Sequence, residues 1–481
     1  MGGKFSRRRL LIAGGTATAL VMGVGYRLLG QSPPARGQPS DPTETPEETE
    51  TSTTEAPPTG AENIKDYGAE PNPEDPNLES AVRNTKALRA AATAAGEGGT
   101  IYVPPGTYFF GQEDRTSNVG FGENEPAGIS IVGDGPSKST LALTEHLDNG
   151  DESHVLFKYR NVSHGEIEIR DIAIDGNYEN LGNLIEAERA SRAFEMNGTG
   201  SISFNNVFFR GIYTTALRLR EFNASIDRCT FEEIGIGGKD HGGSGHAVET
   251  YVKYGDELTI RRCSFRRIGS FAVNWRYNDG AIVMEDCHVS GTGTGIVKLS
   301  TGNRLEIRNS YLEAHTEWLT EHISTPDGEV PFHGRHFINK LFERGERVPT
   351  VVLENVEFHD CTHEAFKIRQ APIELHGDMI ALHRASGPYN EEEGDNAVFR
   401  DYAWTGSAIR NIDIKRLSVH DARGDVFEVP NSNGAIETLN RRGNAGLGTV
   451  GDVEIETDNV DAEAFRPAVV SRDEVGCSFD S

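Results

Sequence analysis

The chain has little lysine and a large excess of acidic residues. Of its 481 residues, 74 are aspartate or glutamate and 47 are lysine or arginine, and only 11 of these 47 are lysine. A net charge of −27 keeps a protein soluble and repels nucleic acid, so we exclude nucleic acid as a partner. Scarce lysine beside so many carboxylates is a composition that resembles proteins of extreme halophiles.

Cysteine is also scarce, with five residues and no paired spacing. This pattern excludes a disulfide framework and a zinc site built on cysteine. Histidine and acidic residues gather in the insertion 315–347, but without a repeated ligand spacing, so we assign no metal site and expect this segment to form a wall of a groove.

The N-terminal part of the chain lacks the features of a folded domain. Residues 1–30 contain Arg7, Arg8 and Arg9 followed by the apolar run 10–26, and they resemble a twin-arginine signal, which exports folded proteins. The alternative is an uncleaved membrane anchor, because the run is at the short end of what spans a bilayer. Residues 31–62 are rich in Pro, Thr, Ser and Glu and predict a disordered acidic linker. The folded domain is therefore expected over 63–481, outside the cell or at its surface, as a monomer.

An eight-residue pattern recurs from residue 167 to 460, with apolar residues at its first, third, sixth and eighth positions. Copies include IEIRDIAI at 167, LTIRRCSF at 258, IVMEDCHV at 282 and VVLENVEF at 351, and the closest copies start 22 to 24 residues apart. Paired alternation indicates two short strands, each with one buried face, and a third strand follows in many copies. Three strands in each repeat predict an all-β parallel β-helix of about ten or more rungs.

Two features of the eight-residue pattern test the predicted register of the rungs. Its middle holds pairs such as Arg170-Asp171 and Asn205-Asn206, and Asn and Asp tolerate the left-handed conformation that a sharp corner needs. Cysteine occupies the sixth position in three successive copies, at 229, 263 and 287. We expect these thiols to be free and stacked in the core, where they act as small apolar groups.

The first part of the domain resembles a known family. The segment IKDYGA at 64–69, the Ala-rich stretch 80–95 and GEGGTIYVPPGTY at 96–108 are similar to the opening of the pectate lyase superfamily. This resemblance implies a single-stranded right-handed β-helix. It leaves calcium open as a cofactor, although the sequence identifies no ligand set for it. Independently, residues 79–95 predict a helix that ends at Gly96 and covers the first rung.

Function must come from the outer surface of such a helix. The third strands predict one outward column of Arg218, Glu249, Asn274, Lys298, Lys367 and Glu428, and a second of Arg220, Tyr251, Arg276, Ser300 and Arg369. These residues form a grid of cations, amides and one aromatic ring on an acidic protein. The resemblance implies a polysaccharide, and an acidic one, as the partner.

Lyases of the superfamily cleave uronate polymers by removing the proton next to the carboxylate, and the resemblance implies that arginine and lysine do this work. We assign Lys298 as the base, Arg276 and Arg369 to the substrate carboxylate, and Lys367 to assist. Arg218, Arg220, Tyr251, Asn274, Ser300, His241 and His246 are the candidates for substrate binding.

Two other functions stay open. A glycoside hydrolase of the polygalacturonase type needs one protonated and one ionised carboxyl. Only Glu249 and Asp240 lie near one another, beside the glycine-rich loop that carries His241 and His246. The third possibility is a cell-surface β-helix that binds carbohydrate without cleaving it.

Overall fold

The computed structural model describes most of the chain from residue 58 onward. The described ranges are 58–73, 77–111, 117–122, 125–144, 155–177, 192–235, 245–251, 256–276, 280–299, 304–314, 335–339, 348–361, 364–368, 372–385, 397–401, 409–422, 424–443, 446–471 and 475–476. The predicted signal 1–30 and all of the predicted linker before residue 58 lie outside them. The first strand begins at Glu62, one residue before the predicted start of the domain. No helix within the described ranges is long and apolar enough to cross a membrane.

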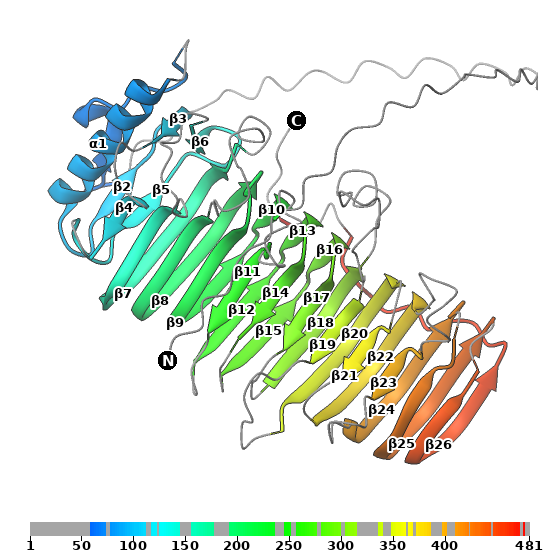
Figure 1. Ribbon diagram of the computed structural model, residues 1–481. Helices are drawn as coiled ribbons and strands as arrows, with labels where there is room; N and C mark the ends of the chain where they lie inside the picture. The colour runs from blue at the N-terminus through cyan, green and yellow to red at the C-terminus, as the bar shows by residue number, and fades with distance from the viewer. Residues whose placement is uncertain are drawn as a thin grey trace, which may run out of the picture. The chain divides into compact units, whose positions relative to one another are not determined.

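The fold is a right-handed parallel β-helix, as the sequence predicts (Figure 1). Its strands are β1 (Glu62–Asn63), β2 (Thr100–Tyr102), β3 (Gly106–Phe110), β4 (Ser117–Phe121), β5 (Ser130–Val132), β6 (Ser139–Leu143), β7 (Val155–Asp175), β8 (Arg192–Arg210), β9 (Thr215–Asp227), β10 (Thr230–Ile234), β11 (Val248–Tyr251), β12 (Glu257–Arg261), β13 (Ser264–Ile268), β14 (Phe271–Trp275), β15 (Ala281–Glu285), β16 (His288–Thr292), β17 (Gly295–Leu299), β18 (Arg304–Glu313), β19 (Arg335–Asn339), β20 (Thr350–Cys361), β21 (Phe366–Ile368), β22 (Ile373–Ala385), β23 (Phe399–Asp401), β24 (Ile409–His420), β25 (Phe427–Arg442) and β26 (Gly448–Val460).

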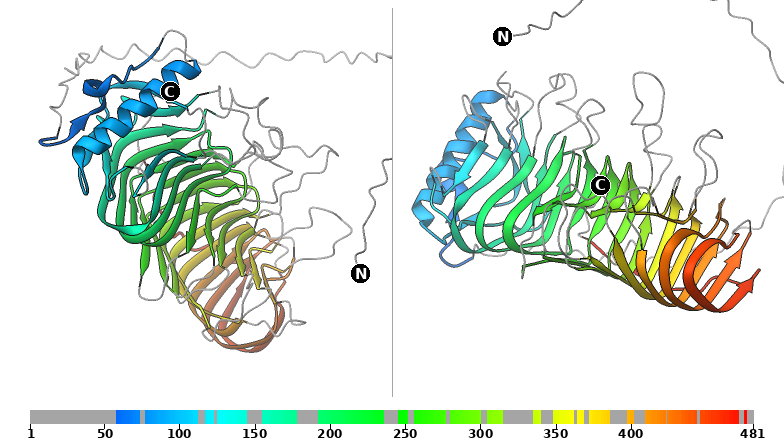
Figure 2. Two further views of the ribbon diagram at one scale, coloured as in Figure 1. Left: turned by 60° about the vertical axis from the view of Figure 1, so that its left-hand side comes forward. Right: turned by 60° about the horizontal axis from the view of Figure 1, so that its bottom comes forward.

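Each strand of a rung pairs with its counterpart in the next rung, which gives three parallel sheets along the helix axis (Figure 2). The first sheet holds the first strand of the repeat, as in β12 and β15, and the second sheet holds the next strand, as in β13 and β16. The third sheet contains β4, the starts of β7, β8 and β9, and then β11, β14, β17, β19, β21 and β23, followed by the starts of β25 and β26. The longest strands bend through a corner and so belong to more than one sheet.

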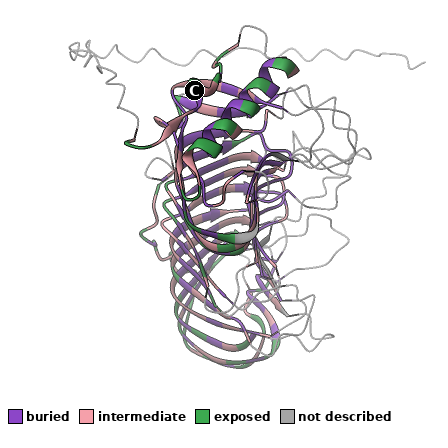
Figure 3. Ribbon diagram, turned by 90° about the vertical axis from the view of Figure 1, so that its left-hand side faces the viewer, coloured by how far each residue is buried: buried purple, intermediate pink, exposed green. Residues whose placement is uncertain are grey.

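Burial alternates along these strands because one side of each faces the core (Figure 3). In β12 and β15 the buried residues are the apolar ones at alternate positions. Cys229, Cys263 and Cys287 are fully buried free thiols. The amide of Ser264 donates to the Cys229 carbonyl, and that of His288 donates to the Cys263 carbonyl, each at 2.9 Å. The three cysteines therefore occupy one column of successive rungs, which confirms the predicted register.

The corners between the first and second sheets also follow the prediction. Asp171, Asn206, Asn309 and Asn355 all have φ between 50° and 57°. Arg262 occupies the same corner with φ 51°, and its guanidinium binds both carboxylate oxygens of Asp227, at 2.8 and 2.6 Å. Such forked pairs join neighbouring rungs and explain part of the preference for arginine over lysine.

Helix α1 (Leu78–Ala95) lies against the N-terminal rungs (Figure 1). Asn77 begins it by accepting a hydrogen bond from the Ser80 amide, and Gly96 ends it, as the sequence predicts. The 3-10 helix η1 (Ile64–Tyr67) precedes it. At the other end, the described segment 461–471 runs back along the corners, and there the Asn355 side chain exchanges two hydrogen bonds with the backbone of Ala468.

The outer face of the second sheet carries a partly buried carboxyl, Glu313 on β18. Burial, and next the nearby Asp360, raise its pKa from 4.5 to about 7, although Arg384 acts in the opposite direction. The folded chain thus keeps a proton that the unfolded chain loses near pH 4.5. The stability that this proton contributes is lost as the pH rises through about 7.

Glu313→Gln is therefore expected to stabilise the protein above neutral pH. The amide keeps the shape of the side chain and removes the charge that burial and Asp360 oppose. At pH 8 the gain in unfolding free energy should be about 1 kcal/mol after allowance for solvent screening. Urea unfolding at pH 5, 6, 7 and 8 measures it. A variant whose stability relative to the wild type did not rise with pH would contradict the assignment.

Candidate functional site

The outer face of the third sheet brings most of the predicted site residues together. In one column Lys158 pairs with Glu195, Glu195 with Arg218, and Arg218 with Glu249. The column continues from Glu249 through Asn274 to Lys298. Next to it, Arg220 pairs with Tyr251, and the Arg276 amide donates to the Thr250 carbonyl, which sets Arg276 beside Tyr251.

Glu249 lies at the centre of this face. Its carboxylate binds two guanidinium groups, with Arg218 Nε at 3.0 Å from one oxygen and Arg276 Nε at 3.1 Å from the other. The Tyr251 hydroxyl lies 3.4 Å from the oxygen that faces Arg276, and the Arg220 guanidinium lies over the Tyr251 ring at 5.0 Å. Only 5% of the Glu249 side chain is exposed, so these ion pairs act at reduced dielectric.

A second carboxylate, Glu195, lies two strands before Glu249 in the same column. Arg192 binds it at 3.1 Å, Lys158 lies 3.9 Å away, and Asn197 donates a hydrogen bond at 3.2 Å. Burial by itself would raise the pKa of Glu195, but Lys158, Arg192 and Arg218 outweigh it and lower the pKa. Glu195 is therefore an ionised group that helps to hold the cations in place.

His246 and Asn274 supply neutral polar groups beneath the cations. Both are buried, and neither side chain has a hydrogen-bond partner within the described ranges. Burial, followed by the charges of Arg276, Lys298 and Arg218, lowers the pKa of His246 well below its ordinary value, so the imidazole is neutral. The Phe271 ring contacts both His246 and Lys298, because the imidazole centre and the lysine amine each lie 5.7 Å from the centre of this ring.

The structure separates some residues that the sequence grouped. Lys298 and Lys367 were predicted as neighbours, but β19 lies between them, because Lys298 pairs with Ile338 and Ile338 with Lys367. Likewise β23 places Arg400 between Lys367 and Glu428. Both are the third strands of rungs whose first two strands are β18 and β22, and both follow long insertions, so the eight-residue pattern marks their rungs but not these strands. His241, Ser300 and Arg369 lie outside the described residues, as does Asp240.

Lys367 belongs to a separate group of charges. Its amine lies 3.5 Å from the buried carboxylate of Glu364, and Arg400 lies 3.9 Å from the same oxygen. Arg400 also binds Glu428 at 2.8 Å. An assisting role of Lys367 for Lys298 would need a substrate that spans two rung spacings, about 10 Å.

Sequence reasoning missed Lys158, Arg192 and Glu195. The signal for them was present, because AFEM at 193–196 repeats the third-strand pattern of ALRL at 216–219. The start of β8 is the third strand of the rung that begins with the copy at 167, and the start of β7 belongs to the rung before it.

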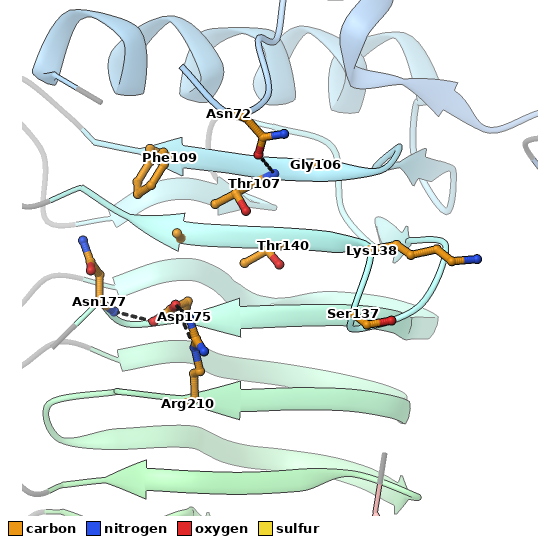
Figure 4. A pocket seen from close by; sticks show the side chains of 11 residues that line it. Asn72, Gly106, Thr107, Phe109, Ser137, Lys138, Thr140, Asp175, Asn177 and Arg210 are labelled. Atoms are coloured by element: carbon orange, nitrogen blue, oxygen red, sulfur yellow. Dashed lines mark hydrogen bonds and ion pairs between the residues drawn. The ribbon is translucent and has the colours of Figure 1, made fainter. Parts of the chain in front are cut away.

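A pocket of about 570 Å³ lies elsewhere, over β3 and β6 near the N-terminal end (Figure 4). Its wall contains Phe109, Lys138 and Asn177, and an ion pair in which Arg210 lies 2.7 Å from Asp175. These side chains belong to the second sheet or its turns, so the pocket does not coincide with the charged face of the third sheet.

The third-sheet face offers no grouped metal ligands among the described residues. The one group of three in these ranges that could hold a metal ion, Glu357, His359 and His383, lies on β20 and β22. The calcium implied by the resemblance therefore has no ligand set on the third-sheet face within the residues described.

Comparison with known proteins gives one family match. The family model described as rhamnogalacturonase A/epimerase, pectate lyase-like, matches residues 61–316. No curated protein matches the sequence.

Several solved structures are similar to this chain at low sequence identity. The catalytic domain of Agl-KA is 12% identical with a TM-score of 0.52, and the match covers 85% of this chain and 69% of that one. The surface adhesin PfbA of Streptococcus pneumoniae is 14% identical with a TM-score of 0.47, and the match covers 83% and 90%. The catalytic unit of the GH87 alpha-1,3-glucanase from Streptomyces thermodiastaticus is 13% identical with a TM-score of 0.42, and the match covers 86% and 71%.

Proposed function

The chain belongs to the rhamnogalacturonase A/epimerase, pectate lyase-like family of carbohydrate-active β-helix proteins, and from this premise we propose that it cleaves an acidic polysaccharide by β-elimination. The substrate would lie along the outer face of the third sheet, across β8, β9, β11, β14 and β17. Such polymers lie outside the cytoplasm, which agrees with the export signal proposed for residues 1–30.

The observation that carries this proposal is the charge of the face. Lys158, Arg192, Arg218, Arg220 and Arg276 are five cations, and Glu195 and Glu249 are two carboxylates, so these side chains have a formal charge of +3 before Lys298 is counted. The whole chain has a charge of −27. A cationic surface on so acidic a protein would attract a polymer of carboxylates and would add little to the binding of a neutral one.

The geometry supports different roles for the cations. Arg218 and Arg276 are held by Glu249, and each guanidinium has further N–H donors that could bind a substrate carboxylate. Binding there would also stabilise the enolate that forms when the proton next to the carboxylate leaves. Lys298 would accept this proton as a neutral amine. The bond to the leaving oxygen then breaks, a carbon–carbon double bond forms, and the oxygen takes a proton from water.

The carboxylates of this face are poorly suited to hydrolysis. A glycosidase needs one carboxyl that donates a proton to the leaving oxygen. The pKa of Glu195 is lowered, and both oxygens of Glu249 face arginines. The described residues of the face therefore favour the lyase over the hydrolase.

A substrate screen tests the function. The purified protein, in high salt, is mixed with uronate polymers and with neutral glucans, and both ultraviolet absorbance and new reducing ends are followed. A lyase produces both signals from an acidic polymer, since the new end carries a double bond. Reducing ends without absorbance would overturn the lyase in favour of the hydrolase, and binding without either signal would leave a non-catalytic surface protein.

Glu249→Gln distinguishes the two enzymes further. A hydrolase that uses this carboxylate would lose activity by a factor of about 100 or more. A lyase should keep measurable turnover and show mainly a higher KM, because the amide oxygen can accept from one arginine but the amide NH2 group cannot accept from the other, and the ion pair is lost. Steady-state kinetics on the substrate from the screen measures both constants. A loss confined to kcat would contradict a role of Glu249 in positioning the two arginines.

A further inference from the structure

A group of rings and carboxylates lies on the second sheet, away from the face described above. Glu357 and His359 are on β20, and His383 is its register neighbour on β22, in the yellow part of Figure 1. One oxygen of Glu357 lies 3.0 Å from His359 Nε2 and 3.3 Å from His383 Nε2. The two imidazole rings stack with centres 4.6 Å apart at an angle of 16°.

These separations fit a tetrahedral metal site. With zinc–nitrogen and zinc–oxygen bonds of about 2.0–2.1 Å, ligand atoms of one tetrahedron lie about 3.3–3.4 Å apart. The three ligand atoms all lie within 4.8 Å of one another, so small rotations of the side chains would enclose an ion. Each side chain is about one fifth exposed, with values of 24, 17 and 23%, so a fourth position would be open to water.

A third imidazole lies beside the three proposed ligands. His420 follows His383 in the same column, and its ring lies 5.8 Å away. His420 is buried, and its Nε2 has no hydrogen-bond partner in the part of the chain that the structure describes.

We propose that Glu357, His359 and His383 bind a divalent transition-metal ion of the zinc type, with His420 beside the ligands and one coordination position open. Two imidazoles and one carboxylate favour such an ion over calcium or magnesium, which bind oxygen ligands. This site is independent of the polysaccharide function. The competing interpretation is a ladder of stacked rings, joined by hydrogen bonds to Glu357, that needs no metal.

Metal titration of the full chain separates the two interpretations. Protein treated with a chelator and dialysed is titrated with Zn²⁺ by calorimetry, and Co²⁺ is used as a spectroscopic probe of coordination by its visible absorption. The wild type should bind one Zn²⁺ at this site, more tightly than Mg²⁺ or Ca²⁺ by at least 100-fold. His383→Gln should weaken Zn²⁺ binding at least tenfold and abolish the Co²⁺ bands.

The matched control is His376→Gln on the same strand. His376 also lies near a carboxylate, 3.3 Å from Asp413, but it belongs to no group of three ligands in the described chain. This variant should bind Zn²⁺ like the wild type. The proposal is overturned if Zn²⁺ does not bind, or if His383→Gln, shown to be folded by circular dichroism, binds it as tightly as the wild type does. Equal weakening by both variants would also overturn it.

Discussion

Cys263→Arg is expected to destabilise the β-helix by about 4 kcal/mol or more. Cys263 is fully buried between Cys229 and Cys287, and its Sγ lies 3.0 and 3.5 Å from the backbone carbonyl oxygens of Arg261 and Ile226, to either of which its one S–H can donate. A guanidinium at this position would be a buried charge without a counterion, in a core with no space for the longer side chain. Urea unfolding in high salt measures the loss.

The same substitution on the outer face of the same rung provides the control. Thr259 is partly exposed on β12, where its hydroxyl bonds Glu257 at 2.8 Å. Thr259→Arg should change stability by only about 0.5 kcal/mol, as surface substitutions usually do. If the two variants were equally stable, the cysteine column would not lie in the core, and the register of every outward residue would have to be revised.

The sequence predicted the rungs well because burial acts on every copy in the same way. Asp171 and Asn309 adopt the left-handed corner because a sharp bend recurs at the same step of each rung. The cysteines share a column because the sixth position always faces inward. Both features repeat along the chain, so one sequence contains several independent observations of each.

The outer face was harder to predict because no periodicity constrains it. Strand β19 has one apolar alternation in a long insertion, so Lys298 and Lys367 were assigned to adjacent rungs although Ile338 lies between them. The position after the eighth residue of the pattern holds His359, His383 and His420 in three successive rungs. Earlier rungs carry Asp175 or Arg210 there. The predicted site residues come from third strands and the loops beside them, so they do not include this histidine column on the second sheet.

The arrangement of charges also could not be predicted from alternation alone. The pattern indicates that Arg218, Glu249 and Lys298 point away from the core, but not which of them form ion pairs. In the structure Glu249 is shared by Arg218 and Arg276, and the Lys298 amine lies 5.7 Å from the centre of the Phe271 ring. Lys298 is a better candidate for a base than the two arginines because an amine loses its proton far more readily than a guanidinium.

Lys298→Ala is expected to reduce β-elimination by a factor of about 100 to 10,000, the usual contribution of a general base, while the fold is retained. Lys298 is partly exposed on the outer face of β17, so its removal takes little from the core. The loss should appear in kcat, because Arg218 and Arg276 would still bind the substrate carboxylate. Turnover on the substrate found by the screen, followed by ultraviolet absorbance, measures it.

Two controls separate a base from a residue that only supports the face. Lys415→Ala removes a lysine exposed on β24 and should leave kcat and KM unchanged. Added primary amines should restore part of the activity of Lys298→Ala, since a small amine can occupy the space left by the side chain and accept the proton, but they should not affect the wild type. If Lys298→Ala keeps wild-type turnover, the base lies elsewhere on this face, and His246, neutral and 5.7 Å from the Phe271 ring, becomes the next residue to replace.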